Sequence, residues 1–269
     1  AEGPTPRRKA LVGALLVVCA LYAVRVVARN RDWSDDVTLY GKTLQLSPDA
    51  YHIRNNLGTV LWKQGEIEEA EREWQAALAL SPRNAIVLNN LGLVRTRQKR
   101  YKEAVDFLSR ATRLKPNYTD PHLNLGAVCQ EMGRRAEAET HLRAAVALSP
   151  LNFDARNKLA KIFLESGRLD LAEEHYSRSA ASQPNWVAYH GLAEINVRRG
   201  DRARAEQHFR RALEINPVAS EARFALGALY SATGRTADAV HEYQAGLATD
   251  PANAQAQATL KELQAEKSR

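Results

Sequence analysis

The sequence contains few of the residues that form disulfides or bind metals in small proteins. Among 269 residues there are two cysteines, Cys19 and Cys129, and one methionine. One cysteine lies in an apolar run near the start of the chain and the other far along it, and neither has a metal-ligand spacing. We therefore expect no disulfide, no structural metal and no cofactor. The fold must be stabilised by packing.

Glycine and aromatic residues are also scarce, with 14 glycines and 7% Phe, Trp and Tyr. Ala, Leu, Arg, Glu and Gln are abundant, a composition that favours helices. Hydrophobic residues make up 45%, which excludes a wholly disordered chain. The net charge of +7 permits weak attraction to acidic partners. We expect no nucleic-acid partner, because no aromatic residues alternate with the basic clusters to form a stacking platform.

Motifs of catalysis are missing as well. The sequence holds no nucleophile elbow, phosphate-binding loop or zinc motif. His141, His175 and His208 recur at one repeat position, but stacked helices lie about 8–10 Å apart, too far for ring nitrogens to share a zinc at about 2.0–2.1 Å. We therefore predict that the chain is not an enzyme, holds no metal and takes no small-molecule substrate.

The strongest positive feature is a proline lattice. Seven of the ten prolines are spaced by 34, 34, 34, 34, 33 and 34 residues, which indicates a repeating supersecondary unit. A Leu-small pair precedes each proline from the second onward by 25 residues, and an alanine precedes it by 12. The lattice prolines are Pro48, Pro82, Pro116, Pro150, Pro184, Pro217 and Pro251.

The spacing within one unit predicts two packed helices. Leu57, Gly58 and Leu61 share one face of a first helix, and Gly58 lets the second helix approach closely. Ala70 and Trp74 lie on the inward stripe of that second helix, and the lattice proline ends it. A unit of this kind cannot bury its apolar face alone, so the units must stack.

This pattern resembles the tetratricopeptide repeat (TPR), a pair of antiparallel helices in 34 residues. The resemblance implies an all-α, right-handed α-solenoid of helix-turn-helix repeats. It covers six repeats, with half-repeats at the two ends. The predicted segments are 32–50 as an N-terminal half-repeat, 51–84, 85–118, 119–152, 153–185, 186–219 and 220–253 as full repeats, and 254–269 as a capping helix.

Three departures fall inside the repeats. Lys99 replaces the glycine that turns the chain between helices, and Arg95 replaces a usually apolar residue. The repeat at 153–185 is one residue short, which predicts a tighter connection near Asn185.

The N-terminal segment is a separate feature. After a basic flank at 1–9, residues 10–28 form an apolar run with one charge, Arg25. Nineteen residues just suffice to span a hydrocarbon core of about 30 Å. A transmembrane helix is therefore the preferred interpretation, with a cleaved signal peptide or a buried soluble helix as alternatives.

The junction after this run resembles the C-terminal end of multi-pass, TPR-containing O-mannosyltransferase-like glycosyltransferases. Arg29, Asn30, Trp33 and Asp35 fit the stretch that leads from the last membrane helix of those proteins into the repeats. The resemblance implies a membrane protein whose TPR region is extracytoplasmic, periplasmic or lumenal. It also implies a non-catalytic piece, because the catalytic acids of that family lie in early membrane loops that have no counterpart in these 269 residues.

Candidate binding residues recur on the first helices, which line the concave groove in TPR proteins. Asn56, Asn90 and Asn124 are each one repeat apart and resemble the asparagine ladder of O-GlcNAc transferase. An amide both donates and accepts, so it matches a peptide backbone. The predicted polar strip continues beside the ladder with Asn55, Asn89, Asn157 and Lys158.

The residues of a dicarboxylate clamp for chaperone tails are not at their places, so that partner is not expected. We predict a membrane-tethered scaffold that binds a peptide or protein segment in the groove. The alternative is the non-catalytic TPR region of a membrane glycosyltransferase, which presents acceptor proteins.

Overall fold

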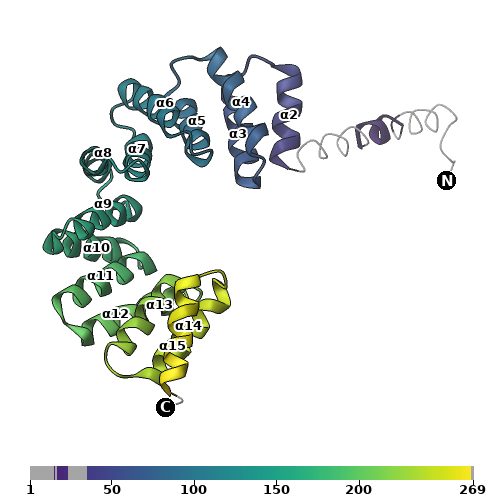
Figure 1. Cartoon of the computed structure of the whole chain (residues 1–269). Coiled ribbons are helices and arrows are strands. Elements are labelled where there is room, and N and C mark those ends of the chain that lie inside the picture. Colours follow the sequence, from purple (N-terminus) through teal and green to yellow (C-terminus); the bar gives the residue numbers. More distant parts are fainter. Residues whose placement is uncertain (1–14, 16, 24–34, 268–269) are drawn as a thin grey trace, which may run out of the picture. The chain divides into compact units, whose positions relative to one another are not determined.

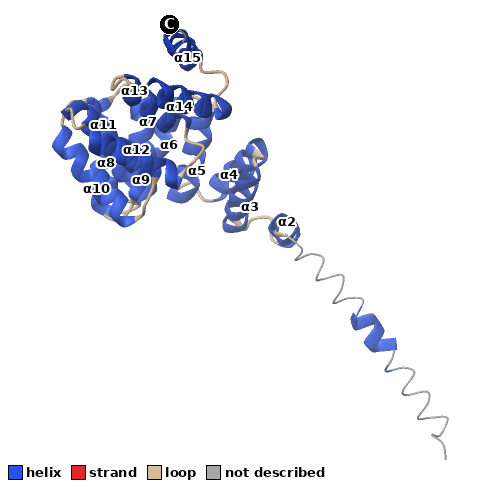
Figure 2. Ribbon diagram, turned by 90° about the horizontal axis from the view of Figure 1, so that it is seen from below, coloured by secondary structure: helices blue, strands red, loops and turns tan. Residues whose placement is uncertain are grey.

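The computed structural model describes residues 15, 17–23 and 35–267 (Figure 1). Within these residues the regular structure is helical throughout, with helices joined by short turns (Figure 2). The chain therefore has the all-α helical-repeat fold that the proline lattice predicts.

A lone helix begins the array, six helix pairs follow, and a lone helix ends it. The first helix is α2 (Asp36–Leu46) and the last is α15 (Ala254–Lys267). The pairs are α3 (Tyr51–Gln64) with α4 (Ile67–Leu80), α5 (Ala85–Arg97) with α6 (Tyr101–Leu114), α7 (Thr119–Glu131) with α8 (Arg135–Leu148), α9 (Phe153–Glu165) with α10 (Leu169–Ser182), α11 (Trp186–Arg199) with α12 (Arg202–Ile215), and α13 (Ser220–Ser231) with α14 (Thr236–Thr249).

Close packing within a pair depends on the small residue of each first helix. A Cβ added to Gly58 would lie 2.7 Å from the Trp74 ring, and one added to Gly92 would lie 2.6 Å from Leu108. Such distances are below van der Waals contact, so in these two pairs glycine lets the large residue of the second helix cross, whereas alanine (Ala160 and Ala193) occupies this position in α9 and α11. Trp74 is buried and its Nε1 donates to the Asn55 carbonyl (3.1 Å).

The turn inside each pair needs a left-handed residue. Five of these turns use glycine with a positive φ, such as Gly65 at 89° and Gly200 at 79°. Lys99 adopts the same conformation, with φ of 58°, in the second repeat. Left-handed backbone is unfavourable for a residue with a Cβ, so this turn is strained.

Three of the turns between pairs are closed by a capping asparagine, Asn84, Asn152 or Asn185. Asn84 Oδ1 accepts from the backbone nitrogens of Ile86 and Val87, and Asn185 Oδ1 accepts from that of Ala188. Such caps satisfy donors at a helix start that have no intrahelical acceptor. Between α10 and α11 the connection has three residues, 183–185, whereas four residues, 81–84, connect α4 to α5. The one-residue deletion near Asn185 falls in this connection.

A recurring ion pair joins successive repeats. Glutamates at one position of the second helix accept from an arginine of the following repeat. Val105 and Val240 occupy this position in the repeats at 85–118 and 220–253. The pairs are Glu71 with Arg95 (2.6 Å), Glu139 with Arg168 (2.5 Å), Glu173 with Arg199 (2.6 Å) and Glu206 with Arg235 (2.9 Å).

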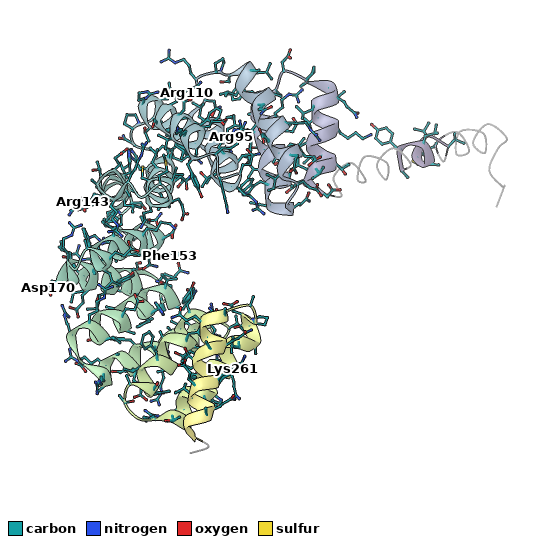
Figure 3. All side chains as sticks on the ribbon, in the orientation of Figure 1. Arg95, Arg110, Arg143, Phe153, Asp170 and Lys261 are labelled. Atoms are coloured by element: carbon teal, nitrogen blue, oxygen red, sulfur yellow. The ribbon has the colours of Figure 1, made fainter. Side chains whose placement is uncertain are left out.

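Arg95 shows how the second departure from the repeat pattern is accommodated. Its buried guanidinium also contacts Glu103 (3.1 Å) and donates to Gln98 (2.9 Å). Figure 3 labels this residue on α5. A buried arginine is tolerated when it is both paired and hydrogen-bonded, as it is here.

The helices form two compact units. The first comprises Ala1–Pro116 and contains α2–α6, and the second comprises Asn117–Arg269 and contains α7–α15. Each has its own buried core: Trp74 and Leu91 lie in a core of the first unit, and Phe163 and Phe209 lie in cores of the second. We describe the two units separately.

The predicted membrane helix at 10–28 falls largely outside the described residues. In the part of it that is described, Leu15, Val17 and Leu21 are exposed apolar side chains on helical backbone. No helix in the described parts of the chain combines the length and apolarity needed to cross a bilayer. The membrane helix therefore stays a prediction.

Candidate groove on the first helices

In the second unit the first helices of neighbouring repeats contact one another. Helix α9 packs against both α7 and α11, in addition to its own partner α10. Helices α7, α9 and α11 thus form a continuous layer. This layer carries three of the residues that the sequence proposes for binding, Asn124, Asn157 and Lys158, whereas the other four lie on α3 and α5 of the first unit.

In the first unit the predicted amides bond to each other. Asn90 Nδ2 donates to Asn55 Oδ1 (3.1 Å), and Asn89 Nδ2 donates weakly to Asn90 Oδ1 (3.4 Å). Asn55 Nδ2 in turn lies 3.5 Å from Asn56 Oδ1. The amides form a chain across α3 and α5, so a ligand must compete with bonds that already exist.

The three ladder residues differ in solvent exposure and do not all belong to the same unit. Asn56 is exposed, while Asn90 and Asn124 are half-buried. Asn56 and Asn90 belong to the first unit, and Asn124 belongs to the second. Peptide binding by these residues stays a prediction.

Two members of the polar strip are buried, and their role in binding stays a prediction. Asn89 is 3% exposed and Asn157 is 6% exposed, so neither side chain extends an open polar surface. The reason for Asn157 is visible in its contact: its Nδ2 donates to Asn185 Oδ1 (2.8 Å), at the junction with the next repeat. Asn55 likewise bonds toward the next repeat, through Asn90. This helix position faces the neighbouring repeat more than the groove.

Lys158 stays at the surface, beside a pocket of about 450 Å³ between α9 and α11. Its Nζ lies 3.5 Å from Asp154, a separation that permits only a weak ion pair. The aromatic rings of Phe153, labelled in Figure 3, and Trp186 also line the pocket. We call this cavity the α9–α11 pocket.

A second cavity, of about 470 Å³, lies between α11 and α13. Its wall is made of small and apolar residues, including Val197, Ala225 and Ala228. Arg198 and Glu194 stand at its edge, and Arg198 donates to the Leu164 carbonyl (2.6 Å). This cavity offers shape and apolar contact but few free polar groups.

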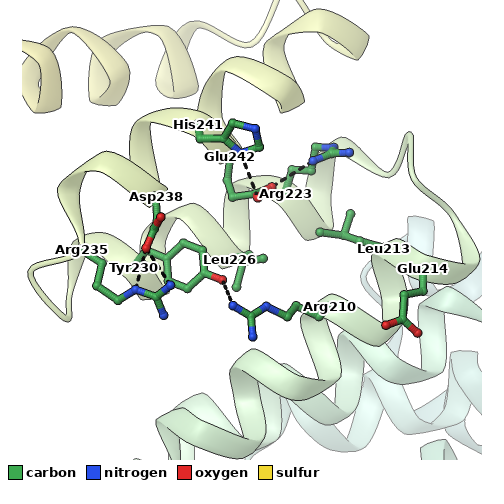
Figure 4. Close-up of a pocket in the computed structure, with 10 residues that line it drawn as sticks. All are labelled: Arg210, Leu213, Glu214, Arg223, Leu226, Tyr230, Arg235, Asp238, His241 and Glu242. Carbon is green, nitrogen blue, oxygen red and sulfur yellow. Dashed lines mark hydrogen bonds and ion pairs between the residues drawn. The ribbon is translucent and has the colours of Figure 1, made fainter.

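A third cavity is polar, and its charges neutralise each other (Figure 4). Arg235 lies over the Tyr230 ring (4.1 Å) and pairs with Asp238 (2.6 Å). Arg223 pairs with Glu242 (3.0 Å), and Arg210 donates to the Tyr230 hydroxyl (3.1 Å). Since every guanidinium here has a partner within the fold, the cluster reinforces the α12–α14 packing.

The recurring histidines lie among packed side chains. The His141 ring stands 5.8 Å from that of His122, and the His175 ring stands 5.4 Å from that of Phe163. Burial lowers the pKa of His141 and of His208, and burial together with Arg156 lowers the pKa of His175. In the described part of the chain, no three His, Cys, Asp or Glu side chains are grouped to hold a metal.

Stacked helix pairs that cross at a small residue, glycine or alanine, define an α-solenoid repeat protein. The tetratricopeptide repeat family matches residues 24–75, 55–119 and 128–185 in one form, and residues 95–147 and 197–263 in another. The chain belongs to the tetratricopeptide repeat family.

A short stretch of the chain is similar to a glycosyltransferase. A stretch of 71 residues is 34% identical to the protein O-mannosyl-transferase Tmtc2 of Drosophila melanogaster. The match covers 26% of this chain and 7% of the relative. It agrees with the resemblance to O-mannosyltransferase-like proteins, over a small part of their length.

Solved structures show the same fold at low identity. The APC/C hetero-tetramer Cut9–Hcn1 aligns with a TM-score of 0.75 at 16% identity, over 83% of this chain and 45% of that one. The type IV pilus biogenesis factor PilW aligns with a TM-score of 0.70 at 21% identity, over 78% and 98%. YrrB, described as a TPR protein with an unusual peptide-binding site, aligns with a TM-score of 0.55 at 23% identity, over 69% and 96%.

Proposed function

We propose that the chain is a membrane-tethered scaffold whose first helices hold a segment of another protein. The observation that carries the proposal is the pair of cavities along α11, one between α9 and α11 and the other between α11 and α13. Clefts with apolar walls and a few polar groups are the usual form of a binding site. YrrB, a fold relative with a peptide-binding site, supports a peptide as the occupant.

Binding through the predicted amides is tested by replacing Asn56, Asn90 and Asn124 with alanine. The helical spectrum should persist, and the affinity for two unrelated bound peptides should fall by about 0.5–1.5 kcal/mol for each lost hydrogen bond. The two peptides should lose similar amounts, because backbone contacts carry no side-chain code. Lys261→Ala, on the exposed face of α15, is the matched control. Unchanged affinity for both peptides would exclude the ladder.

The tether rests on the apolar run at 10–28 and on the basic residues that flank it. The full chain should stay with membranes during carbonate extraction, and a chain beginning at Asp32 should be soluble and helical. If carbonate releases the full chain, the tether is excluded. We place the repeats on the extracytoplasmic side, and protease accessibility in sealed vesicles would measure this.

A second candidate is the non-catalytic TPR region of a membrane glycosyltransferase, which presents acceptor proteins. The short match to Tmtc2 favours it. An antibody against the repeats distinguishes the two candidates in native membranes. A band near the 29.9 kDa of this chain supports the separate scaffold, and a much larger membrane protein supports the transferase.

A further inference from the structure

The α9–α11 pocket contains a buried amide that differs from its equivalent in the first unit. Asn157 and Asn55 occupy the same position of their repeats, the fifth residue of the first helix. Asn55 Oδ1 accepts from Asn90 of the next repeat. The residue that corresponds to Asn90 in the repeat after Asn157 is Gly191, which has no side chain to donate.

Gly191 cannot easily be replaced by a donor, since a Cβ there would lie 2.3 Å from the Tyr176 ring. The same glycine that lets α10 and α11 pack therefore leaves Asn157 without the partner that Asn55 has. Asn157 Oδ1 is buried and has no hydrogen-bond partner among the residues that the structure describes. Buried acceptors of this kind are rare and unfavourable.

The direction of the Asn157 amide is set by its neighbour. Asn157 Nδ2 donates to Asn185 Oδ1 (2.8 Å), while Asn185 Nδ2 donates to Ser179 Oγ (3.1 Å) and to the Gln183 carbonyl (2.8 Å). Turning the Asn157 amide over would bring two acceptor oxygens together. The oxygen of Asn157 is therefore the atom that stays unbonded, and a ligand satisfies it by donating an N–H.

The rest of the pocket defines the ligand further. Phe153, Trp186 and Ile215 give it an apolar wall that suits a bulky apolar side chain. Lys158 and Lys161 exceed the single carboxylate of Asp154 by one charge, so the lining favours an acidic neighbour. Since Asn157 Oδ1 is itself buried, lining side chains must shift slightly as the ligand enters.

We propose that the α9–α11 pocket binds an extended peptide segment in which a bulky apolar residue adjoins Asp or Glu. The apolar side chain fills the wall of Phe153 and Trp186, the carboxylate faces Lys158 and Lys161, and a backbone N–H donates to Asn157 Oδ1. This inference rests on the proposed scaffold function and specifies its partner.

The test begins with capped random heptapeptides selected for binding to the full chain. The selected peptides should contain an apolar residue next to an acidic one. Their affinity should fall about tenfold in Asn157→Leu, while the unfolding midpoint of this variant should change little, because the substitution removes an unbonded buried acceptor together with the bond that Asn157 donates to Asn185. The matched control is Asn55→Leu, which removes an acceptor already in use. Its midpoint should fall and its affinity for these peptides should not change.

Scanning the peptide with N-methyl groups identifies the donated N–H. At one position, N-methylation should weaken binding to the parent about tenfold and cause no further loss in Asn157→Leu. The double variant Lys158→Gln/Lys161→Gln, whose side chains reach the surface, should bind the acidic peptide and its Gln analogue equally. The N-methyl scan on the parent and the lysine double variant remain decisive if Asn157→Leu fails to fold.

The possible failures are distinguishable. If no peptide is selected, the scaffold proposal and the pocket both fail. If selected peptides bind Asn157→Leu and the lysine variant as well as the parent, the scaffold stands and the pocket is overturned. If Asn157→Leu lowers the midpoint as Asn55→Leu does, and no N-methyl position matters in the parent, Asn157 is structural only.

Discussion

At the scale of single residues, the chain departs from its repeat pattern where a side chain meets an unfavourable backbone or an unusual neighbour. Lys99 takes a left-handed turn that glycine makes in the other repeats. Arg95 places a cation where the pattern has an apolar residue and is held by Glu71 and Glu103. The first departure leaves strain that one substitution should release.

We expect Lys99→Gly to raise the free energy of unfolding by roughly 0.5–1 kcal/mol. Relief of left-handed strain in the native state outweighs the greater freedom of glycine in the unfolded chain. Urea titration followed by circular dichroism measures the change. The control Lys102→Gly, at an exposed position in the first turn of α6, should instead lower stability, by less than the about 1 kcal/mol that glycine costs in a helix interior. A loss of stability in both variants would contradict the strain.

Residue-level detail also limits what the sequence could predict. The Leu-Gly pairs and the proline lattice locate the helices, because every repeat must meet the same packing requirement. The hydrogen bonds of an amide are not predictable in this way. Asn55 and Asn157 occupy the same repeat position, but Asn55 bonds to Asn90 whereas Asn157 bonds to Asn185. Periodicity predicts position, whereas hydrogen bonding depends on neighbours that differ from repeat to repeat.

At the scale of elements, the second helices pack through buried alanines, and the packing leaves no room for a larger side chain at these positions. Ala138 is 0% exposed on α8, while Ala136, two residues earlier, is exposed. We expect Ala138→Leu to lower the free energy of unfolding by about 1–3 kcal/mol through overpacking. Ala136→Leu should change it little. Chemical denaturation of the two variants measures both effects, and equal losses would contradict the packing arrangement.

The same helices should make stability depend on pH. Burial lowers the pKa of His141, His175 and His208 from the ordinary 6.5, so the unfolded chain binds protons more readily than the native one. Stability should therefore fall as pH decreases through 6.5, by at most about 1.4 kcal/mol per pH unit for each proton taken up. The pKa values of Glu139 and Glu206 are also lowered from 4.5, so protonation of these two carboxyl groups lowers stability at a lower pH than the histidines do.

Urea titrations at pH 7.5 and 5.5 measure this dependence. Replacing the three histidines by glutamine should flatten it. A slope that survives the replacement would assign the effect to other groups. The replacement leaves Glu139 and Glu206 in place, so stability should still fall below pH 4.5.

At the scale of the whole molecule, the division into two units was not predictable from the repeat pattern. The spacing runs evenly through Pro116, yet the contacts divide the chain at that residue. Spacing reports the phase of each helix pair, whereas cooperativity depends on how much each pair buries against the next.

We expect the two units to unfold independently. Amide hydrogen exchange of Ala138→Leu should accelerate across the repeats of the second unit and stay unchanged in the repeats at 51–84 and 85–118. A loss of about 1.4 kcal/mol corresponds to tenfold faster exchange through cooperative opening. Faster exchange throughout 51–253 would show that the repeats unfold as one body.

The glutamate–arginine pairs between repeats have a consequence for lengthening the array by duplication. A second copy of 153–185 placed after the first would offer Arg168 to Glu173 and a new Glu173 to Arg199, so both joints would remain charge-matched. A copy of 85–118 at the same place would offer Val105 to Arg199 and leave that guanidinium without its Glu173 partner. Insertions into this array thus obey a rule of order: the residue at this position in the second helix of one repeat determines which repeat can follow it.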